Sequence, residues 1–294
     1  MSREATEFEQ YRSQLIGVAY RILGCIEDAQ DAVQETWIRW QEQEQAKVNN
    51  VRSWLIKVCS RVALDKLKLV SRKRESYVGP WLPEPWLIDE NDPSQKSSID
   101  ESVSIGLLLI METLSPIERA SFLLHDVFDV SFKEIANTLE KDEALCRKAA
   151  SRARKKIRDS KPKKQSTLQK HKELAQSFFD AVKEADFSKI ESLLSTEVRL
   201  VADSDGKARS ANKILTNSKV IASLMTWVGK REQKLGSNLE WETVWFSGAP
   251  GFVSYEYGEP TTAYQFEIDD ESIRSIYVHR NPEKLRLFVT NKGN

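Results

Sequence analysis

The stretch Val130–Ile157 reads VSFKEIANTLEKDEALCRKAASRARKKI, and it decides the fold of the middle of the chain. Ser131 is a typical N-cap residue for a short amphipathic helix, and a turn near Glu140 leads into a longer basic helix. A short helix, a turn and a basic helix in this order predict a helix-turn-helix, whose second helix enters a DNA major groove. The apolar positions are spaced to pack the two helices across each other: Ile135, Ala136, Leu139, Leu145 and Ala149.

The outward face of the second helix carries the side chains that we expect to contact DNA. Arginine suits bidentate contact with guanine, while lysine mostly attracts phosphates. A surface helix with a solvated charged face is the alternative, but the order of the three elements favours DNA binding. The predicted contacts are Arg147, Lys148, Ser151, Arg152, Arg154 and Lys155.

The zero net charge of the 294-residue chain hides two basic segments. Residues 47–74 contain nine Lys and Arg against one acid, and residues 144–164 contain ten against one. The balancing acids lie in separate blocks, at 27–44 and 84–118. Separate basic and acidic stripes predict two kinds of partner, one of them a nucleic acid.

Residues 5–74 have helical periodicity, interrupted by a polar loop at 41–50. The helix expected at 51–70 combines Trp54 with basic residues, and an aromatic ring beside cations suits unpaired bases. Core packing is the alternative for Trp54, and Trp37 and Trp40 are expected in the core or on a partner-facing surface. The predicted contacts of this helix are Arg52, Trp54, Lys57, Arg61 and Lys66.

The residue composition changes twice after residue 75, first at a proline-rich segment and again after residue 164. Residues 76–98 hold four of the nine prolines together with several aromatic residues, which predicts a linker that packs on a domain or docks on a partner. Helices are expected again from 99 to 113 and from Pro116, and 161–164 is expected to be a hinge. Beyond it, helices at 171–185, 187–194 and 212–227 precede strands at 239–246, 252–257, 261–268 and 273–279, which predicts an α+β domain.

Composition excludes several classes. No apolar run approaches the roughly 18 residues that a membrane span needs, and the first residues do not form a secretory signal. The three cysteines have no metal-ligand spacing, so we expect buried reduced thiols in a cytoplasmic protein. We expect no cofactor, no metal and no membrane partner.

Two motifs resemble a known family. DAQDAVQETW at 28–37 with VRSWL at 51–55 resembles region 2 of the extracytoplasmic-function (ECF) sigma factors, and LSPIER at 114–119 with the helix-turn-helix resembles region 4. The resemblance implies two all-α domains that bind core RNA polymerase and promoter DNA. It implies that region 2 melts and reads the −10 element and that region 4 reads the −35 element. The polymerase contacts that it implies are Asp28, Asp31, Gln34, Glu35 and Trp37.

The remainder resembles the subgroup of these sigma factors that carries a C-terminal SnoaL-like domain, an α+β cone. YVGPWLPEP at 77–85 matches the linker motif, and NPEKL at 281–285 matches an NPDKL tail. DSDGK at 203–207 lies where the subgroup has DGGGK, with Ser204 and Asp205 in place of two glycines. The resemblance implies that this domain tunes activity from within the chain. The regulatory contacts that it implies are Tyr77, Pro80, Trp81, Pro83, Asp203, Gly206, Lys207, Asn281, Pro282, Glu283 and Lys284.

These expectations divide the chain into region 2 at 1–75, a linker at 76–98, region 4 at 99–160, a hinge at 161–167 and the SnoaL-like domain at 168–294. For the last domain two alternatives stay open. One is an enzyme related to SnoaL-like cyclases and isomerases, with Asp203, Asp205, His171 and His279 as acid or base candidates. The other is a sensor for an unidentified small molecule, whose pocket would be lined by some of Trp227, Trp241, Trp245, Tyr255, Tyr257 and Phe266, unless these rings form a packed core.

A third alternative concerns the whole chain. It is a plain operator-binding regulator that makes no contact with polymerase. Two features argue against it, because a repressor needs neither: the acidic helical segment before residue 41, with Glu27, Asp28 and Asp31, and the basic helix at 51–70 that carries Trp54.

Overall fold

The computed structural model describes residues 3–44, 48–74, 76–87, 104–160, 166–246, 249–269 and 271–289. These residues form two compact units. Unit 1 comprises the described residues up to 76 together with 104–160, and unit 2 comprises 77–87 together with the described residues from 166 onward.

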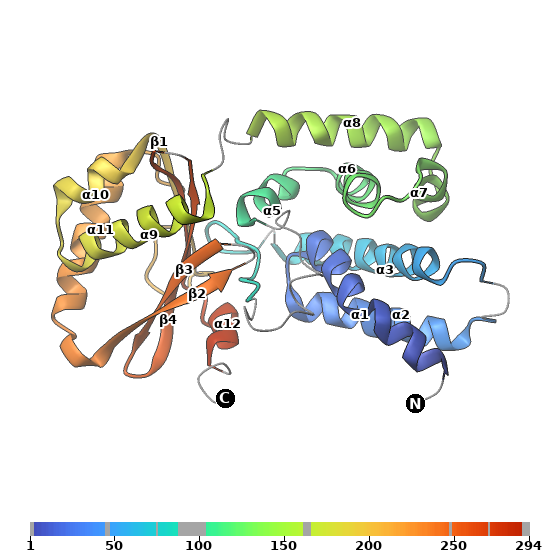
Figure 1. Cartoon of the computed structure of the whole chain (residues 1–294), viewed down its shortest axis with the longest axis horizontal. Coiled ribbons are helices and arrows are strands. Elements are labelled where there is room, and N and C mark those ends of the chain that lie inside the picture. The colour runs from blue at the N-terminus through green and yellow to red at the C-terminus, as the bar shows by residue number, and fades with distance from the viewer. Residues whose placement is uncertain are drawn as a thin grey trace. The chain divides into compact units, whose positions relative to one another are not determined.

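Unit 1 begins with three helices, α1 (Arg3–Leu23), α2 (Ile26–Glu42) and α3 (Val51–Arg74), which pack on one another (Figure 1). Their apolar faces bury Phe8, Leu15 and Trp40 almost completely, as the helical periodicity predicts. Gly24 follows the last residue of α1. Its backbone takes a φ of 70°, which glycine adopts without a steric penalty, and its N–H donates to the Tyr20 carbonyl at 2.7 Å.

The second part of unit 1 contains α5 (Ile105–Glu112), α6 (Pro116–Phe122), a π-helical turn η3 (Leu123–Val127), α7 (Phe132–Leu139) and α8 (Glu143–Ser160). Two capping boxes start α6 and α7, at Ser115 and Ser131, and Ser131 is the N-cap that the sequence predicts. Glu140 ends α7 in the left-handed region, with a φ of 53°, and so turns the chain into α8. In Figure 1, α6 and α7 lie between α8 and α3.

Unit 2 is an α+β domain, as expected. Its helices are α9 (Leu168–Lys183), α10 (Phe187–Leu193), α11 (Ser218–Gln233) and the short α12 (Pro282–Leu285). Its strands are β1 (Leu194–Asp203), β2 (Leu239–Phe246), β3 (Ala249–Glu256), β4 (Glu259–Ile268) and β5 (Ile273–His279). They form one sheet in the order β1-β5-β4-β3-β2, in which β1 and β5 are parallel and the other neighbours are antiparallel.

Several elements of unit 2 differ from the expectations, and β1 and α11 differ for reasons that the structure shows. Strand β1 was not predicted, because charged residues such as Glu197 and Arg199 interrupt its apolar positions. Its side chains are buried from Leu200 to Asp203, where β5 pairs with it. Helix α11 begins at Ser218 rather than at 212, because the Asn217 side chain caps it by accepting from the Val220 N–H at 3.2 Å.

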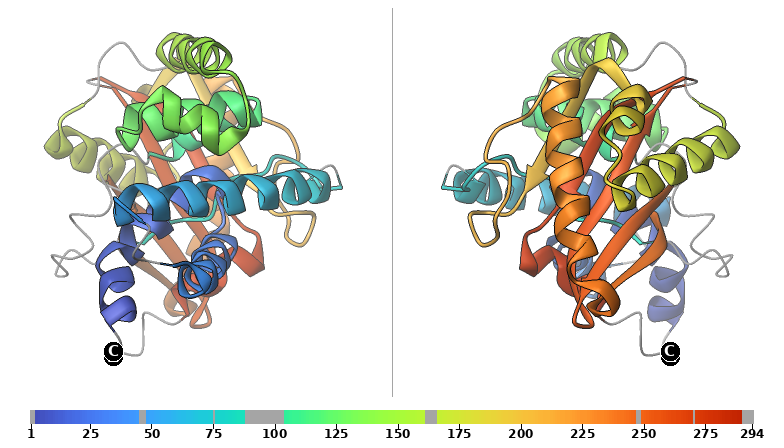
Figure 2. Two further views of the ribbon diagram at one scale, coloured as in Figure 1. Left: turned by 90° about the vertical axis from the view of Figure 1, so that its right-hand side faces the viewer. Right: turned by 90° about the vertical axis from the view of Figure 1, so that its left-hand side faces the viewer.

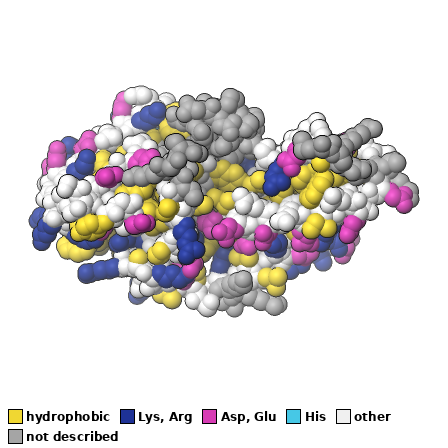
Figure 3. All heavy atoms as spheres, turned by 90° about the horizontal axis from the view of Figure 1, so that it is seen from below, with side chains coloured by type: hydrophobic (Ala, Val, Ile, Leu, Met, Phe, Trp, Pro, Cys, Tyr) yellow, Lys and Arg dark blue, Asp and Glu magenta, His cyan; other side chains and the backbone are white. Residues whose placement is uncertain are grey.

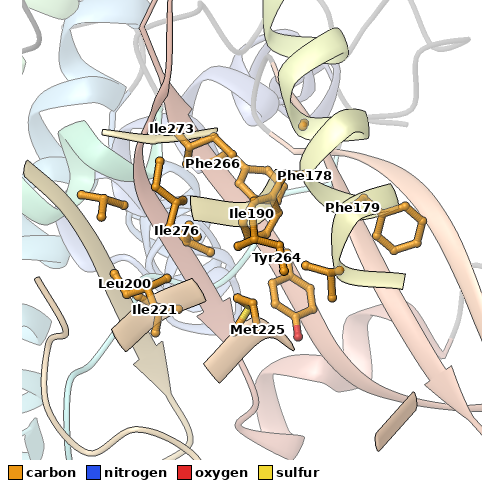
Figure 4. Packing of buried hydrophobic residues seen from close by; sticks show 14 of the residues in the cluster. Phe178, Phe179, Ile190, Leu200, Ile221, Met225, Tyr264, Phe266, Ile273 and Ile276 are labelled. Carbon is orange, nitrogen blue, oxygen red and sulfur yellow. The ribbon is translucent and has the colours of Figure 1, made fainter. Parts of the chain in front are cut away.

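Helices α9 and α11 cover one face of the sheet (Figure 2), and the core of unit 2 lies between these layers. Figure 4 shows aromatic rings such as Phe178 and Phe266 packed against aliphatic side chains in this core. The two helices approach closely at Gly229, where a Cβ atom would lie 1.9 Å from the Val182 carbonyl oxygen.

The proline-rich segment packs on the rest of unit 2 along residues 77–87. Leu82 is fully buried, and Leu87 forms an isolated β-bridge with Phe246. The described part of the segment therefore packs on a domain, which was one of the two alternatives. The remainder of the predicted linker and residues 161–165 of the predicted hinge lie outside the described residues.

Within the described ranges, no helix is both long enough and apolar enough to span a membrane.

Candidate nucleic-acid interface and Asp203 cluster

The helix-turn-helix is built by hydrogen bonds between near neighbours in the sequence. The Ser131 hydroxyl accepts from the Glu134 N–H at 3.3 Å, and the Glu134 carboxylate accepts from the Ser131 N–H at 3.2 Å. Ile135 and Ala136 of α7 and Ala149 of α8 are buried, as their spacing predicts. This packing leaves one side of α8 to solvent.

All six predicted contacts on α8 are exposed, and they fall into two groups. Arg152 and Arg154 form ion pairs within unit 1, to Glu118 at 2.9 Å and to Asp126 at 2.7 Å, and so also fasten α8 to the preceding helical segment. The remaining residues make no ion pair to another element of the described chain, although Arg147 pairs with Glu143 one turn away on α8. They are Arg147, Lys148, Ser151 and Lys155.

Glu118 accepts two cations of α8, because Lys156 also lies 3.2 Å from it. Burial works to raise the pKa of Glu118, but the Ser115 N–H and the two cations outweigh it, so the pKa is lowered. Glu118 therefore serves both the N-terminus of α6 and the placement of α8. The sequence signals only its capping role, because the partners on α8 lie more than thirty residues away.

Part of the predicted unpaired-base site forms a groove between α2 and α3. Trp54, Lys57 and Arg61 line a hollow of about 540 Å³, and Arg39 contributes from α2. The Trp54 ring also contacts the buried Trp40 ring, with centroids 5.2 Å apart, so Trp54 is a half-buried wall of the groove.

The other two candidates on α3 do not line this groove. The Arg52 guanidinium donates to Gln14 at 3.2 Å, and the Lys66 ammonium pairs with Asp31 at 3.2 Å. Arg39 was missed because its i, i+4 pairing with Glu35 is typical of any exposed helix face.

The acidic residues of α2 form an exposed face that also carries a hydrophobic side chain. Asp31 and Gln34 are exposed, and Asp28 and Glu35 are half-buried. The predicted polymerase contact Trp37 packs on Phe8, with ring centroids 5.0 Å apart and planes tilted by 59°. Ile38 lies one turn beyond Gln34 and is 49% exposed. On the surface that it presents, Figure 3 shows acidic side chains in a row beside basic and hydrophobic ones, so the zero net charge hides local separation.

The strongest polar cluster of unit 2, called here the Asp203 cluster, consists of Tyr77, Leu82, Asp203, Asn281 and Lys284. Asp203 is fully buried at the end of β1. Its carboxylate accepts from the Leu82 N–H at 2.7 Å, from the buried Lys284 ammonium at 2.6 Å and from the Tyr77 hydroxyl. The Asn281 amide donates to the Tyr77 hydroxyl at 2.9 Å, and Lys284 also donates to the Leu82 carbonyl.

The cluster joins three segments that lie far apart in the sequence. Burial and the hydrogen bond to Asp203 raise the pKa of Tyr77, so its hydroxyl stays protonated. The Lys284 ammonium lies 4.5 Å from the centre of the Trp81 ring, which adds a cation–π contact. Segment 77–87 is thus fastened to β1 and to the NPEKL segment at once.

The altered loop at 203–207 contributes a second set of contacts. The Asp205 carboxylate accepts from the Val78 N–H at 3.2 Å, and the Lys207 ammonium lies 2.9 Å from both Asp205 and Glu283. Asp205 takes a φ of 50°, which aspartate tolerates better than most residues. Gly206 takes a φ of 67°, and a Cβ atom there would lie 3.3 Å from the Val78 side chain.

Three of the predicted regulatory contacts make few interactions of their own. Pro83 is buried and Pro80 is half-buried, while Pro282 is exposed at the first turn of α12. These prolines fix backbone direction rather than donate or accept hydrogen bonds.

Three of the four acid–base candidates of unit 2 are buried, namely Asp203, His171 and His279, and Asp205 is half-buried. His279 accepts or donates only through Nε2, 3.0 Å from Gln265, and burial and the Lys284 charge lower its pKa to about 3. Burial also lowers the pKa of His171. Asp203 has its carboxylate occupied by the three donors already named, and Asp205 is engaged by Val78 and Lys207.

The expected aromatic pocket is almost filled. About 10 Å³ of space remains among these rings, roughly the space that a single water molecule needs. Of the six predicted lining residues, Trp241 and Phe266 border this space. Trp227 and Tyr257 are instead 47% and 72% exposed, because they point away from the core.

The three cysteines are free thiols, with Cys59 and Cys146 buried and Cys25 half-buried. In the part of the chain that the structure describes, no group of three or more His, Cys, Asp or Glu side chains is placed to hold a metal ion.

Comparison with known proteins agrees with both halves of this description. The chain matches the family models described as Sigma-70 region 2, over residues 8–73, and Sigma-70, region 4, over residues 105–157. It is 33% identical to the ECF RNA polymerase sigma factor SigJ of Mycobacterium tuberculosis, over 96% of this chain and 93% of that protein. It is also 31% identical to the probable ECF RNA polymerase sigma factor SigI of the same organism, over 64% of this chain and 66% of that protein.

A solved structure extends the similarity to the whole fold. The crystal structure of the Mycobacterium tuberculosis extracytoplasmic function sigma factor SigJ matches with a TM-score of 0.78 and 31% identity. The match covers 96% of this chain and 98% of that chain, so it includes unit 2 as well as the two helical regions.

Proposed function

Because the chain belongs to the ECF family of RNA polymerase sigma factors and directs promoter-specific transcription initiation, we propose that helix α8 reads the −35 element through Arg147, Lys148, Ser151 and Lys155. The observation that supports this assignment is the exposed basic side of α8 in a helix-turn-helix whose first helix begins with a capping box. Arg147 is the best candidate for a base contact, because its pair with Glu143 is exposed and costs little to exchange for guanine. Arg152 and Arg154 stay candidates for phosphate contacts.

The groove between α2 and α3 is the proposed site for the melted −10 element. An exposed groove of about 540 Å³ with one tryptophan wall and several cations suits an unpaired base and its phosphates. Trp54 would stack on the base, while Lys57 and Arg61 would neutralise the backbone.

The exposed face of α2 is the proposed contact with core RNA polymerase. Asp28, Asp31, Gln34 and Glu35 provide its polar part, and Ile38 adds an apolar side chain that is 49% exposed. An apolar centre within a charged rim is typical of protein interfaces. Trp37 supports this face from within, because its ring packs on Phe8.

Unit 2 is proposed to tune transcription from within the chain rather than to catalyse a reaction. Its contacts with residues 77–87 support this role, because that segment lies between region 2 and region 4 in the sequence. The buried and fully engaged Asp203 argues against acid–base catalysis. The nearly filled aromatic core argues against a small-molecule sensor.

The experiment that tests the DNA assignment is transcription and promoter binding with core polymerase and the full chain. We expect Arg147→Ala to weaken binding to the cognate promoter by about 1–3 kcal/mol and to relax the preference at one base pair. Arg158→Ala, in the last turn of the same helix, is the matched control and should weaken binding equally on all sequences. Unchanged transcription and promoter preference with Arg147→Ala would contradict the assignment of α8.

A further inference from the structure

The side chain of Arg147 lies over an aromatic ring of the preceding helix, α7. Its guanidinium carbon is 4.7 Å from the centre of the Phe132 ring, a distance at which the electrons of a ring face attract a cation. Phe132 is the first residue of α7 and is 8% exposed, whereas the Arg147 side chain is 60% exposed. The buried ring therefore supports an arginine whose remaining surface is largely open to solvent.

A second ring packs on the same phenylalanine. The imidazole of His125 lies with its centroid 4.0 Å from the centroid of Phe132, and the two planes are tilted by 39°. His125 belongs to the π-helical turn η3, and its Nδ1 lies 3.1 Å from the Val130 carbonyl oxygen. Since a carbonyl oxygen only accepts, the imidazole donates this hydrogen bond through Nδ1–H. His125, Phe132 and Arg147 thus form a series of contacts from η3 through α7 to α8, called here the Phe132 stack.

The π-helical turn contacts both helices of the helix-turn-helix. Its widened backbone hydrogen bond runs from the Phe128 N–H to the Leu123 carbonyl at 3.1 Å. Two successive residues of the turn reach different helices, since His125 packs on α7 and the Asp126 carboxylate accepts from Arg154 of α8 at 2.7 Å. Single π-helical turns occur often at functional sites. The turn η3 therefore fixes α7 and α8 to the same short segment.

The contact with the ring leaves the hydrogen-bond donors of Arg147 available for a base. Nε and Nη2 both donate to one oxygen of Glu143, at 3.0 Å and 2.5 Å, and Nη1 makes no hydrogen bond within the described ranges of the chain. Attraction to a ring uses none of these donors, so it can continue when guanine replaces the exposed Glu143 pair. Glu143 holds Arg147 only within α8, whereas Phe132 ties the guanidinium to the other helix of the motif.

We propose that Phe132 is a positioning residue for promoter recognition, because it holds the Arg147 guanidinium in the direction from which that side chain reads one base pair of the −35 element. The inference rests on the proposed role of Arg147 and deepens it by naming the residue that orients the reading side chain. A free arginine loses rotamers when it binds a base, and the ring lowers that cost by restricting the side chain beforehand. Phe132 therefore contributes to base preference through Arg147 rather than through a contact of its own with DNA.

The test measures promoter binding by the full chain with core polymerase, on promoter fragments in which each −35 base pair is varied in turn. Arg147→Ala first identifies the base pair at which the preference disappears. Phe132→Leu keeps a buried apolar side chain but removes the ring. It should lower the preference at that base pair, and the affinity for the cognate promoter, by about two- to fivefold. Preferences at the other base pairs should not change.

A double-mutant cycle separates positioning from an effect on the fold. In the Arg147→Ala background, Phe132→Leu should cause no further loss of promoter affinity, because the side chain that the ring orients is gone. Phe132→Tyr keeps the ring and should keep the wild-type preference. Phe132→Met is a second variant without the ring, for use if Phe132→Leu folds poorly. Ile135→Val is the matched control, since it loosens the buried packing of α7 and should lower the melting temperature without changing the preference at any base pair.

Wild-type preference in a folded Phe132→Leu or Phe132→Met protein would overturn the inference. An equal loss of promoter affinity from Phe132→Leu with and without Arg147 would overturn it too, because Phe132 would then act on the fold alone. The same holds if a folded Phe132→Tyr protein loses as much preference as Phe132→Leu, since the ring would then be irrelevant. Failure of the proposed function has a different signature, because Arg147→Ala would then leave the preference unchanged at every −35 base pair.

Discussion

Replacing Lys284 by methionine leaves the buried carboxylate of Asp203 without its cation. The ammonium lies 2.6 Å from that carboxylate, and both side chains are almost inaccessible to water. Methionine fills a similar volume, so the substitution removes the charge with little loss of packing. The Leu82 carbonyl loses its ammonium donor in the same step.

The expected magnitude follows from the burial of the pair. Removing one partner of a buried ion pair costs about 3–5 kcal/mol, because the remaining charge is left uncompensated in a poor solvent. For a unit of this size each kcal/mol lowers the melting temperature by about 2–4 °C, so the expected decrease is on the order of 10 °C. The loss should concentrate at residues 77–87, because the Leu82 and Tyr77 contacts depend on the placement of Asp203.

The assay combines thermal unfolding with hydrogen exchange of the peptide that covers residues 77–87. The Leu82 amide donates to Asp203 at 2.7 Å in the native protein, so its protection should fall in Lys284→Met. Adding Asp203→Asn should recover roughly 2 kcal/mol, since the double variant no longer buries a lone charge. Lys230→Met, at an exposed lysine of α11, is the control and should change stability by no more than about 0.5 kcal/mol.

Two results would refute this reasoning. The first is a change in stability below about 1 kcal/mol in Lys284→Met, since it would mean that the pair is not desolvated. The second is unchanged exchange at 77–87 despite a large loss of stability, since the cluster would then not hold that segment. If the segment is released, we expect the transcription rate to change while promoter preference does not, because α8 is untouched.

Two further predictions concern unit 2. Gly229→Ala should lower the free energy of unfolding by at least about 1–3 kcal/mol, as measured by chemical unfolding. The new Cβ would lie 1.9 Å from the Val182 carbonyl oxygen and force α9 and α11 apart. A near-neutral effect would contradict this close approach. Burial raises the pKa of Glu232 to about 7. The folded state therefore binds this proton more tightly than the unfolded state does. As pH rises from about 4.5 to 7, Glu232 destabilises the folded state increasingly. Glu232→Gln should therefore stabilise the protein by about 3 kcal/mol at pH 8 and hardly at pH 4.5, and a pH-independent difference between the two proteins would refute the shift.

The sequence by itself determined the helices and strands that interactions between near neighbours in the chain specify. Ser115 and Ser131 start their helices through bonds to residues three positions later, and both capping boxes were predictable from the letters alone. The same holds for the order of short helix, turn and basic helix, and for strands β2 and β5, whose bounds agree with the prediction. Helical and strand periodicities extend over a few residues and need no knowledge of the remaining chain.

Only the tertiary structure decided what depends on distant partners. Strand β1 contains charged positions that argue against a strand, yet it pairs in parallel with β5, which lies more than seventy residues further along. Asp203 looks like an ordinary acid in the sequence, but a carboxylate is tolerated in the interior only when a cation and hydrogen-bond donors reach it. Its cation is Lys284, more than eighty residues further along the chain, and only folding brings the two together.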